Sequence, residues 1–147
     1  MAIVVGNALV SSRLDFCNSL LSSISCRDLR KLQCVQNTLA RIVFQKRKFS
    51  RVSPILKSVH WLPVKQRIQF KLGTLIYKFL SCGEPGYLRV HVFKSTVFRS
   101  KVHFQNSLCY EGPLLWNSLP DGVRSAPSLS CFCSRLKTYL FRQAYPP

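Results

Sequence analysis

The residues that follow Pro63 repeat apolar side chains with the period of an α-helix, and no other feature of the chain restricts its fold as much. The apolar positions that share one face are Val64, Ile68, Leu72, Leu75, Ile76 and Phe79. Pro63 suits a first helical turn because its missing N–H would have no partner there, and Gly83 is typical of a helix end. Gly73, inside the run, is expected to allow another element to pack closely. The pattern therefore predicts a helix with one buried face.

A second amphipathic helix is predicted over residues 29–44. Its apolar positions are Leu29, Leu32, Val35, Leu39, Ile42 and Val43. Ser25, followed by Asp28, resembles a capping box at the start of this helix. Lys46, Arg47 and Lys48 follow its end, where positive charge is favourable beside the helix dipole.

Further helices are predicted over residues 8–22 and after Ser128, which suits a helix N-cap. The stretch "LRVHVFKSTVFRSKVHF" alternates and is rich in β-branched residues, which favours short strands or a hairpin. We therefore expect a mainly α fold, a small helical domain with a short β-hairpin or strand element in the middle. Residues 1–82 form about three helices, 83–112 an irregular or β-hairpin connector, and 113–147 a C-terminal turn and helix on the same core.

The charge balance points to a polyanionic partner. The chain has 22 Lys and Arg residues against 5 Asp and Glu residues, a formal net charge of +17. Such a chain attracts nucleic acid or an anionic membrane surface. No uninterrupted apolar run approaches the ~20 residues of a membrane span, and the apolar first residues lack the basic segment of a secretory signal. We expect an intracellular protein of the nucleus or cytoplasm, not secreted, whose partner is an RNA or DNA backbone and not a membrane.

Catalytic and metal chemistry is not indicated. The five acidic residues are Asp15, Asp28, Glu84, Glu111 and Asp121, far apart in sequence, whereas two-metal nucleotidyl transfer needs clustered carboxylates. The chain has neither a glycine-rich phosphate loop nor a nucleophile elbow. Its seven cysteines contain no Cys-x-x-Cys pair, so they are interpreted as reduced, buried structural thiols and not zinc ligands. We expect no catalytic residue, no metal and no cofactor.

Two basic segments are the candidate contacts with nucleic acid. The stretch "FQKRKFSR" (44–51) is a phosphate-binding patch, a solvated helix end or a nuclear import signal, and the first interpretation is slightly favoured. In the helix after Pro63, Arg67, Lys71, Thr74 and Lys78 form a narrow basic stripe beside the apolar face, where backbone contact and an ordinary polar surface remain equally open. The candidate residues are Lys46, Arg47, Lys48, Arg51, Lys57, Arg67, Lys71 and Lys78.

Two tryptophans have two interpretations each. His60-Trp61 is either an aromatic platform on which an exposed base stacks, or a hydrophobic cap packed on the helix that starts after Pro63. The cap is favoured, because most tryptophans in folded proteins are largely buried. The same alternatives and the same preference apply to Trp116.

Four blocks of the sequence, taken in order, resemble the region downstream of the polymerase core in the reverse transcriptase of non-LTR (LINE-type) retrotransposons. The blocks are "SSRLDFCNSLL" (11–21), "KLQCVQNTLARIV" (31–43), "VHWLPVKQRIQFKLGTLIYKFL" (59–80) and "GPLLWNSLPDGVRSAPSLSCFCSRLKTYLF" (112–141). Residues 60–64 match the family's His-Trp-Leu-Pro-Val element, and residues 116–120 match its Trp-Asn-Ser-Leu-Pro element. The family's endonuclease and the paired aspartates of its polymerase palm have no counterpart in this chain.

The resemblance implies a noncatalytic C-terminal fragment of an RNA-directed DNA polymerase that assists template or target binding, beside a reverse transcriptase core as a further partner. Two alternatives remain open. The chain is a structural or interaction module that packs on the polymerase body, or a translated remnant without a selected function.

Overall fold

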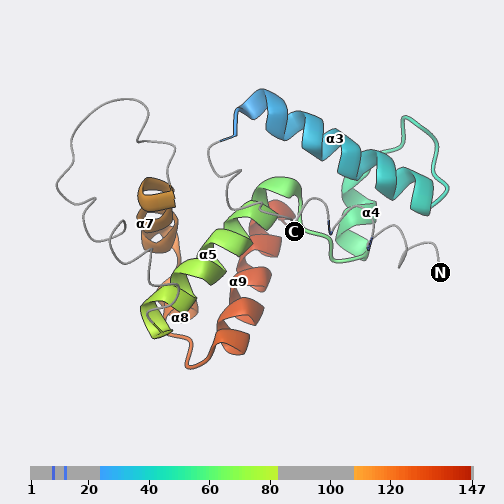
Figure 1. The fold of residues 1–147 in the computed structure, drawn as a ribbon. Coiled ribbons are helices and arrows are strands. Elements are labelled where there is room, and N and C mark those ends of the chain that lie inside the picture. Colours follow the sequence, from blue (N-terminus) through green and yellow to red (C-terminus); the bar gives the residue numbers. More distant parts are fainter. Residues whose placement is uncertain (1–7, 9–11, 13–23, 83–107, 147) are drawn as a thin grey trace.

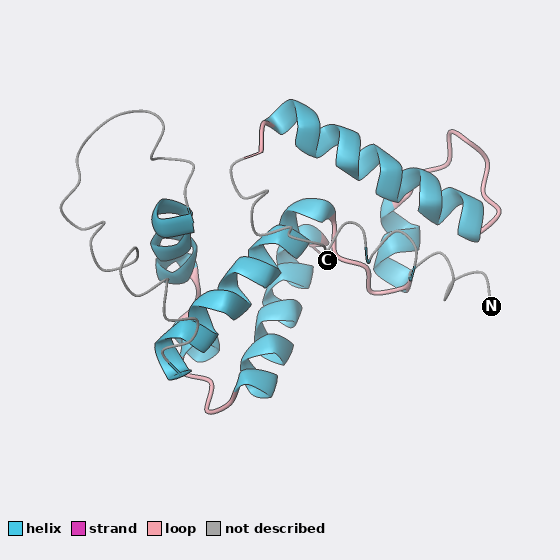
Figure 2. Ribbon diagram, in the orientation of Figure 1, coloured by secondary structure: helices cyan, strands magenta, loops and turns pink. Residues whose placement is uncertain are grey.

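The computed structural model describes residues 8, 12, 24–82 and 108–146, and the ordered elements within these ranges are helices (Figures 1 and 2). They are α3 (Cys26–Val43), α4 (Ser53–Ser58), α5 (Val64–Cys82), α7 (Leu108–Ser118), α8 (Asp121–Arg124) and α9 (Leu129–Ala144). No strand occurs in these described ranges, so the predicted mainly α fold is confirmed. The predicted helix 8–22, the predicted hairpin and Gly83 lie outside the described residues, apart from residues 8 and 12. None of the described helices is long and apolar enough to cross a membrane.

Helices α5 and α9 lie side by side in opposite directions at the centre of the molecule (Figure 1). α5 begins directly after Pro63 and α9 directly after Ser128, as predicted. The α5–α9 core is the cluster of the buried residues Leu62, Tyr77, Leu119, Val123, Ala126, Phe132, Leu136 and Leu140. Val64, Ile68, Leu72 and Phe79 of the predicted α5 face are buried, but the α5 residue in this cluster is Tyr77, which the predicted face did not include.

Gly73 lets the two central helices approach closely. A Cβ atom built on Gly73 would lie 2.9 Å from Cδ2 of Leu136, which is nearer than real Cβ contacts come. Leu136 packs directly on the backbone of α5 because Gly73 has no side chain. The close packing expected at this glycine is confirmed.

Aromatic rings fill the centre of the α5–α9 core. The Tyr77 and Phe132 rings stack with centroids 4.3 Å apart, and the Trp116 ring stacks on Phe132 at 5.8 Å. The Tyr77 hydroxyl donates a 2.7 Å hydrogen bond to the carbonyl oxygen of Ala126, so its one polar atom is satisfied. Trp116 is thus half-buried against the core, as its packed interpretation predicted.

A second cluster, the α3–α4 core, consists of the buried residues Ala40, Val52, Leu56 and Trp61. Trp61 is 7% exposed, so its predicted burial is confirmed and a base-stacking platform at Trp61 is excluded. The predicted partner is wrong, because Trp61 packs against α3 and α4 and not on α5, and His60 is exposed. Helix α4 was not predicted, although Ser53 followed by Pro54 is a typical start of a helix.

Side chains of α3 and of Tyr145, which directly follows α9, hold residues 61–64, which we call the corner. The Tyr145 hydroxyl donates to the carbonyl oxygen of Trp61 at 2.9 Å, and the Gln36 amide donates to that of Leu62 at 2.9 Å. The N–H of Val64 donates to Oε1 of Gln33 at 2.9 Å, which satisfies one of the free N–H groups at the start of α5. The corner therefore connects the two cores, because Trp61 belongs to the α3–α4 core and Leu62 to the α5–α9 core.

The predicted apolar face of α3 is partly wrong. Val35 is 52% exposed and Ile42 69% exposed, whereas Gln36 and Ala40 are the buried side chains. The hydrogen bonds of Gln36 and Gln33 to the corner set the rotation of α3 about its axis. In this orientation the Gln36 side chain faces the core, and the Val35 and Ile42 side chains face solvent. A buried amide is tolerated because its polar atoms are paired.

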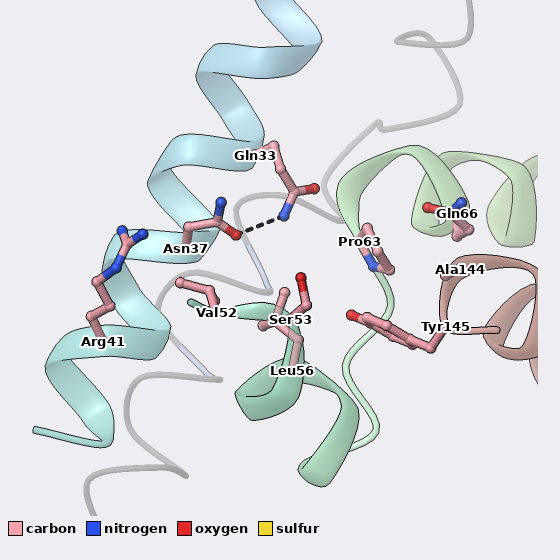
Figure 3. Close-up of a pocket in the computed structure, with 10 residues that line it drawn as sticks. All are labelled: Gln33, Asn37, Arg41, Val52, Ser53, Leu56, Pro63, Gln66, Ala144 and Tyr145. Atoms are coloured by element: carbon pink, nitrogen blue, oxygen red, sulfur yellow. Dashed lines mark hydrogen bonds between the residues drawn. The ribbon is translucent and has the colours of Figure 1, made fainter. Parts of the chain in front are cut away.

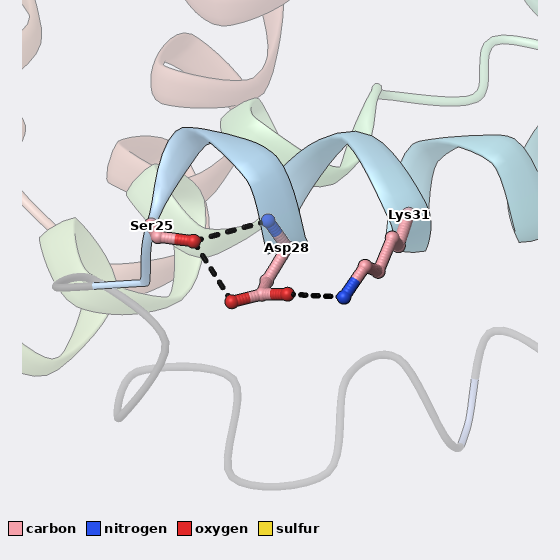
Figure 4. A network of polar contacts seen from close by, with 3 residues as sticks. All are labelled: Ser25, Asp28 and Lys31. Carbon is pink, nitrogen blue, oxygen red and sulfur yellow. Dashed lines mark hydrogen bonds and ion pairs between the residues drawn. The ribbon is translucent and has the colours of Figure 1, made fainter.

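The start of α3 is capped as predicted. The Ser25 hydroxyl accepts the backbone N–H of Asp28 at 3.1 Å and donates to the Asp28 carboxylate at 2.8 Å, which in turn accepts from Lys31 at 2.8 Å (Figure 4). The Lys31 ammonium, and next the Ser25 hydroxyl, lower the pKa of Asp28. A full capping box would instead join the acid to the N–H of Ser25.

Helix α7 begins at Leu108 and extends into the segment 83–112 that the sequence assigned to the connector. Gly112 is buried in this helix, and a Cβ atom built on it would lie 3.4 Å from Cδ1 of Ile76 on α5. Pro113 follows inside the helix. A Gly-Pro pair normally ends a helix. Here the helix continues through the pair, and the tight packing of Gly112 on α5 accounts for this.

Candidate nucleic-acid interface

The residues 44–51 that connect α3 to α4 form a compact turn, which we call the basic loop. Gln45 adopts the left-handed conformation, with φ at 49°, and the N–H of Lys46 donates to the carbonyl oxygen of Arg41 at 2.9 Å. The N–H of Ser50 donates to the carbonyl oxygen of Arg47 at 3.0 Å. Nε of Arg41 donates to the carbonyl oxygen of Ser50 at 3.2 Å and so ties the loop back to α3.

The cations of the basic loop face solvent, and none of them pairs with an acid of the described ranges. Lys46, Arg47, Lys48 and Arg51 are all exposed. Within the described ranges, the ion pairs join Asp28 to Lys31 and Asp121 to Arg124, and none reaches these four cations. Their positive charge is therefore not neutralised by the described part of the chain, and it is available to an anionic partner.

The basic loop also carries an exposed aromatic ring, which was not among the predicted contact residues. Phe49 is 90% exposed, and Nζ of Lys48 lies 5.9 Å from the centre of its ring. Aromatic rings beside cations are the usual platform on which unpaired bases stack. The available signal was a phenylalanine flanked by cations in a segment without apolar periodicity.

We expect Phe49→Ala to weaken the binding of single-stranded RNA or DNA by about 1–3 kcal/mol, because one base loses its stacking partner. Binding of duplex DNA should change little, since its bases stay stacked inside the helix. Fluorescence anisotropy with single-stranded and duplex oligonucleotides measures both effects. Phe49→Tyr, which keeps the ring, is the control and should bind as the original chain does; equal losses for Phe49→Tyr and Phe49→Ala would contradict a stacking role.

The other candidate residues divide into two groups. Lys57 on α4 and Lys71 and Lys78 on α5 are exposed. Arg67 is half-buried, and its Nε donates to the carbonyl oxygen of Leu62 at 3.1 Å, so it supports the corner. Thr74 is half-buried as well, and its hydroxyl donates to the carbonyl oxygen of Phe70 at 2.7 Å.

The predicted stripe on α5 is therefore divided, because α9 and the corner cover part of that helix surface. Figure 1 shows the basic loop at the right-hand end of α3, whereas the C-terminal end of α5 lies at the lower left. Lys78 thus lies apart from the basic loop, and the two do not form one patch.

A polar cavity of about 420 Å³ lies between α3, α4, the start of α5 and the end of α9. Its polar lining side chains are Gln33, Asn37, Arg41, Ser53, Gln66 and Tyr145 (Figure 3). Its apolar lining side chains are Val52, Leu56, Pro63 and Ala144. Burial raises the pKa of Tyr145 to about 12, against the opposing charge of Arg67, so this hydroxyl is protonated at neutral pH. No acidic residue of the described ranges lines the cavity.

A second cavity, of about 410 Å³, lies between the start of α3, α5 and α7. Aliphatic side chains that include Ile68, Leu72 and Leu115 supply much of its wall, and Lys65 and Glu111 also line it. It has no cluster of cations, so it is the weaker candidate for an anionic partner.

Cys26, Cys34, Cys131 and Cys133 are free thiols. Cys26 and Cys34 are exposed, so the expectation of buried thiols is wrong for these two, because α3 turns their positions away from both cores. Cys131 and Cys133 are half-buried on different sides of α9. Within the described ranges, no group of three or more His, Cys, Asp or Glu side chains is placed to hold a metal ion.

No family model, curated protein or solved structure matches this chain. The basic loop and the polar cavity beside it are therefore the features on which a functional proposal depends.

Proposed function

We propose that this chain binds the backbone of RNA or DNA through its basic loop, as a noncatalytic C-terminal part of a retrotransposon reverse transcriptase of the non-LTR type. The observation that carries the proposal is the set of four exposed loop cations, Lys46, Arg47, Lys48 and Arg51, without an acidic partner in the described ranges. The resemblance of four sequence blocks supports the retrotransposon setting.

The chemistry of the loop favours phosphate over any other anion. Arginine presents a planar fork that matches two phosphate oxygens, and lysine adds a mobile point charge. Contacts of this kind hold a strand in place without reading its sequence. The chain would therefore strengthen the binding of a polymerase to its template or target without taking part in the chemical step.

A filter-binding titration of RNA and of duplex DNA at two or more salt concentrations tests the proposal. Each neutralised phosphate contributes roughly 0.7–0.9 to the fall of log K with log salt, so contacts by all four loop cations predict a slope of about −3 or steeper. Absent binding, or binding that salt does not weaken, would remove the proposal.

One observation favours a second candidate, a module that docks on another protein. Val35 and Ile42 on α3 are 52% and 69% exposed, and they are seven residues apart on the same side of the helix. Such an exposed aliphatic pair suits a contact with a polymerase body. In that case, reversal of the loop charges would leave the docking intact, and this outcome separates the two candidates.

A further inference from the structure

We propose that the polar cavity between α3, α4, α5 and α9 receives one unpaired nucleobase of the bound strand, so that the chain prefers single-stranded to duplex nucleic acid. The inference rests on the proposed function and narrows its ligand. It depends on three observations, which are the polar groups left free in the cavity, the position of Arg41, and the size and apolar walls of the space.

Several polar groups of the cavity are already committed to the fold. The Gln33 amide donates to Oε1 of Gln36 and to Oδ1 of Asn37, both at 3.0 Å, and its oxygen accepts the N–H of Val64. The Tyr145 hydroxyl donates to the carbonyl oxygen of Trp61. These hydrogen bonds fix the Gln33 and Tyr145 side chains in the cavity wall. Only the unused lone pairs of their oxygen atoms remain to accept a hydrogen bond from a ligand.

The remaining polar groups have no hydrogen-bond partner within the described ranges. They are the Nδ2 amide of Asn37, the whole carboxamide of Gln66 and the hydroxyl of Ser53. Figure 3 shows that Gln33, Ser53, Gln66 and Tyr145, from different elements, point toward one space. Together, these groups offer donors and acceptors side by side, and carboxamides are the side chains that match the paired donor and acceptor edge of a base.

Arg41 connects the cavity to the basic loop. Its Nε is held by Ser50 at 3.2 Å, and its two terminal nitrogens have no partner within the described ranges. Ser50 lies between Lys48 and Arg51, and the cavity residues Val52 and Ser53 follow the loop directly in the chain. A strand whose phosphates lie on the loop therefore brings its next bases to the mouth of the cavity.

The size and the walls of the cavity fit a base. A volume of about 420 Å³ is within the ~300–1,000 Å³ of small-ligand sites, and it exceeds the needs of a single ion. Val52, Leu56, Pro63 and the Tyr145 ring supply apolar surface against which the faces of a base can lie. Because the described residues that line the cavity include no carboxylate, they do not repel a nearby phosphate.

Two substitutions test the cavity while sparing the fold. Asn37→Asp keeps Oδ1 as the acceptor for Gln33, removes the free N–H and places negative charge in the cavity. Gln66→Ala removes a carboxamide that the described residues do not use. Asn117→Asp and Gln143→Ala are the matched controls, because they make the same chemical changes at exposed positions outside the cavity.

The ligands for anisotropy titrations are a short mixed-sequence RNA, an abasic strand of the same length, and the corresponding duplex. We expect the unmodified chain to bind the base-bearing strand more tightly than the other two. Asn37→Asp should weaken binding of that strand about tenfold, through a lost hydrogen bond and added repulsion. Gln66→Ala should weaken it about threefold, and both controls should bind normally. Unchanged melting temperatures would show that neither cavity variant acts through unfolding.

The outcomes separate this inference from the proposed function. Salt-dependent binding of all three ligands with equal affinity would overturn the base-binding cavity and leave the proposed function standing. Discrimination between the strands that persists in both cavity variants would overturn the cavity as well. No binding of any ligand would overturn both proposals.

Discussion

Replacement of Lys46, Arg47 and Lys48 together by glutamate is expected to weaken the binding of RNA and DNA roughly 100-fold or more. Three phosphate contacts at about 1 kcal/mol each or more are lost, and each becomes a repulsion. The slope of log K against log salt should become shallower by about 2–3, since each phosphate contributes roughly 0.7–0.9. Filter binding at several salt concentrations measures both quantities.

A second triple substitution separates a local site from the effect of total charge. Arg30, Lys137 and Arg142 are exposed and lie outside the basic loop. Their replacement by glutamate changes the net charge by the same amount, from +17 to +11, because each exchange removes one positive and adds one negative charge. Equal losses for both triples would mean that the charge acts diffusely and that the basic loop is not a site.

Stability should be nearly unaffected by the loop triple. The three side chains are exposed and make no ion pair within the described ranges, and surface changes of this kind usually alter the free energy of unfolding by at most about 0.5 kcal/mol. A loss of nucleic-acid binding at an unchanged melting temperature would favour the nucleic-acid proposal over a docking module.

Phe132→Ala is expected to lower the free energy of unfolding by about 3–5 kcal/mol, the usual range for a phenylalanine removed from a core. Phe132 is 0% exposed, and it contacts Tyr77 and Trp116 by ring stacking, so the substitution opens a cavity where α5, α7 and α9 meet. Small domains are stable by only about 5–15 kcal/mol, so the variant should be close to unfolding. Urea denaturation followed by circular dichroism measures the change.

Phe49→Ala is the control for this substitution, because it removes the same side chain from a position that is 90% exposed. It should change the free energy of unfolding by less than about 0.5 kcal/mol. A gradual, non-cooperative melt of the unmodified chain would contradict a packed α5–α9 core. It would favour the alternative of a translated remnant without a selected function.

Local pattern was enough to predict the two central helices. The apolar period after Pro63 predicted α5 and most of its buried face, because burial of one face is the main stabilisation of such helices, and Ser128 predicted the start of α9 as its N-cap. The close packing at Gly73 was predicted because a glycine inside a helix leaves room for a neighbouring element. The cap at Ser25 was predicted because its partner, Asp28, is only three residues away in sequence.

The candidate site was predicted only in part. Lys46, Arg47, Lys48 and Arg51 were selected correctly as exposed cations, because charge in a segment without apolar periodicity stays in solvent. Arg67 was grouped with them, although it supports the carbonyl oxygen of Leu62. Phe49 was not selected, although its position between cations in a segment without apolar periodicity was a signal for an exposed ring.

The sequence itself determined that this protein is helical, strongly basic and equipped with a cationic turn after its first described helix, because periodicity, charge and caps act over a few residues. The tertiary structure alone decided that α3 turns Gln36 inward and Ile42 outward, and that Asn37, Ser53, Gln66 and Tyr145 surround one cavity. These outcomes depend on hydrogen bonds and packing between residues up to 84 positions apart, such as Tyr145 and Trp61, and local pattern carries no information about such pairs.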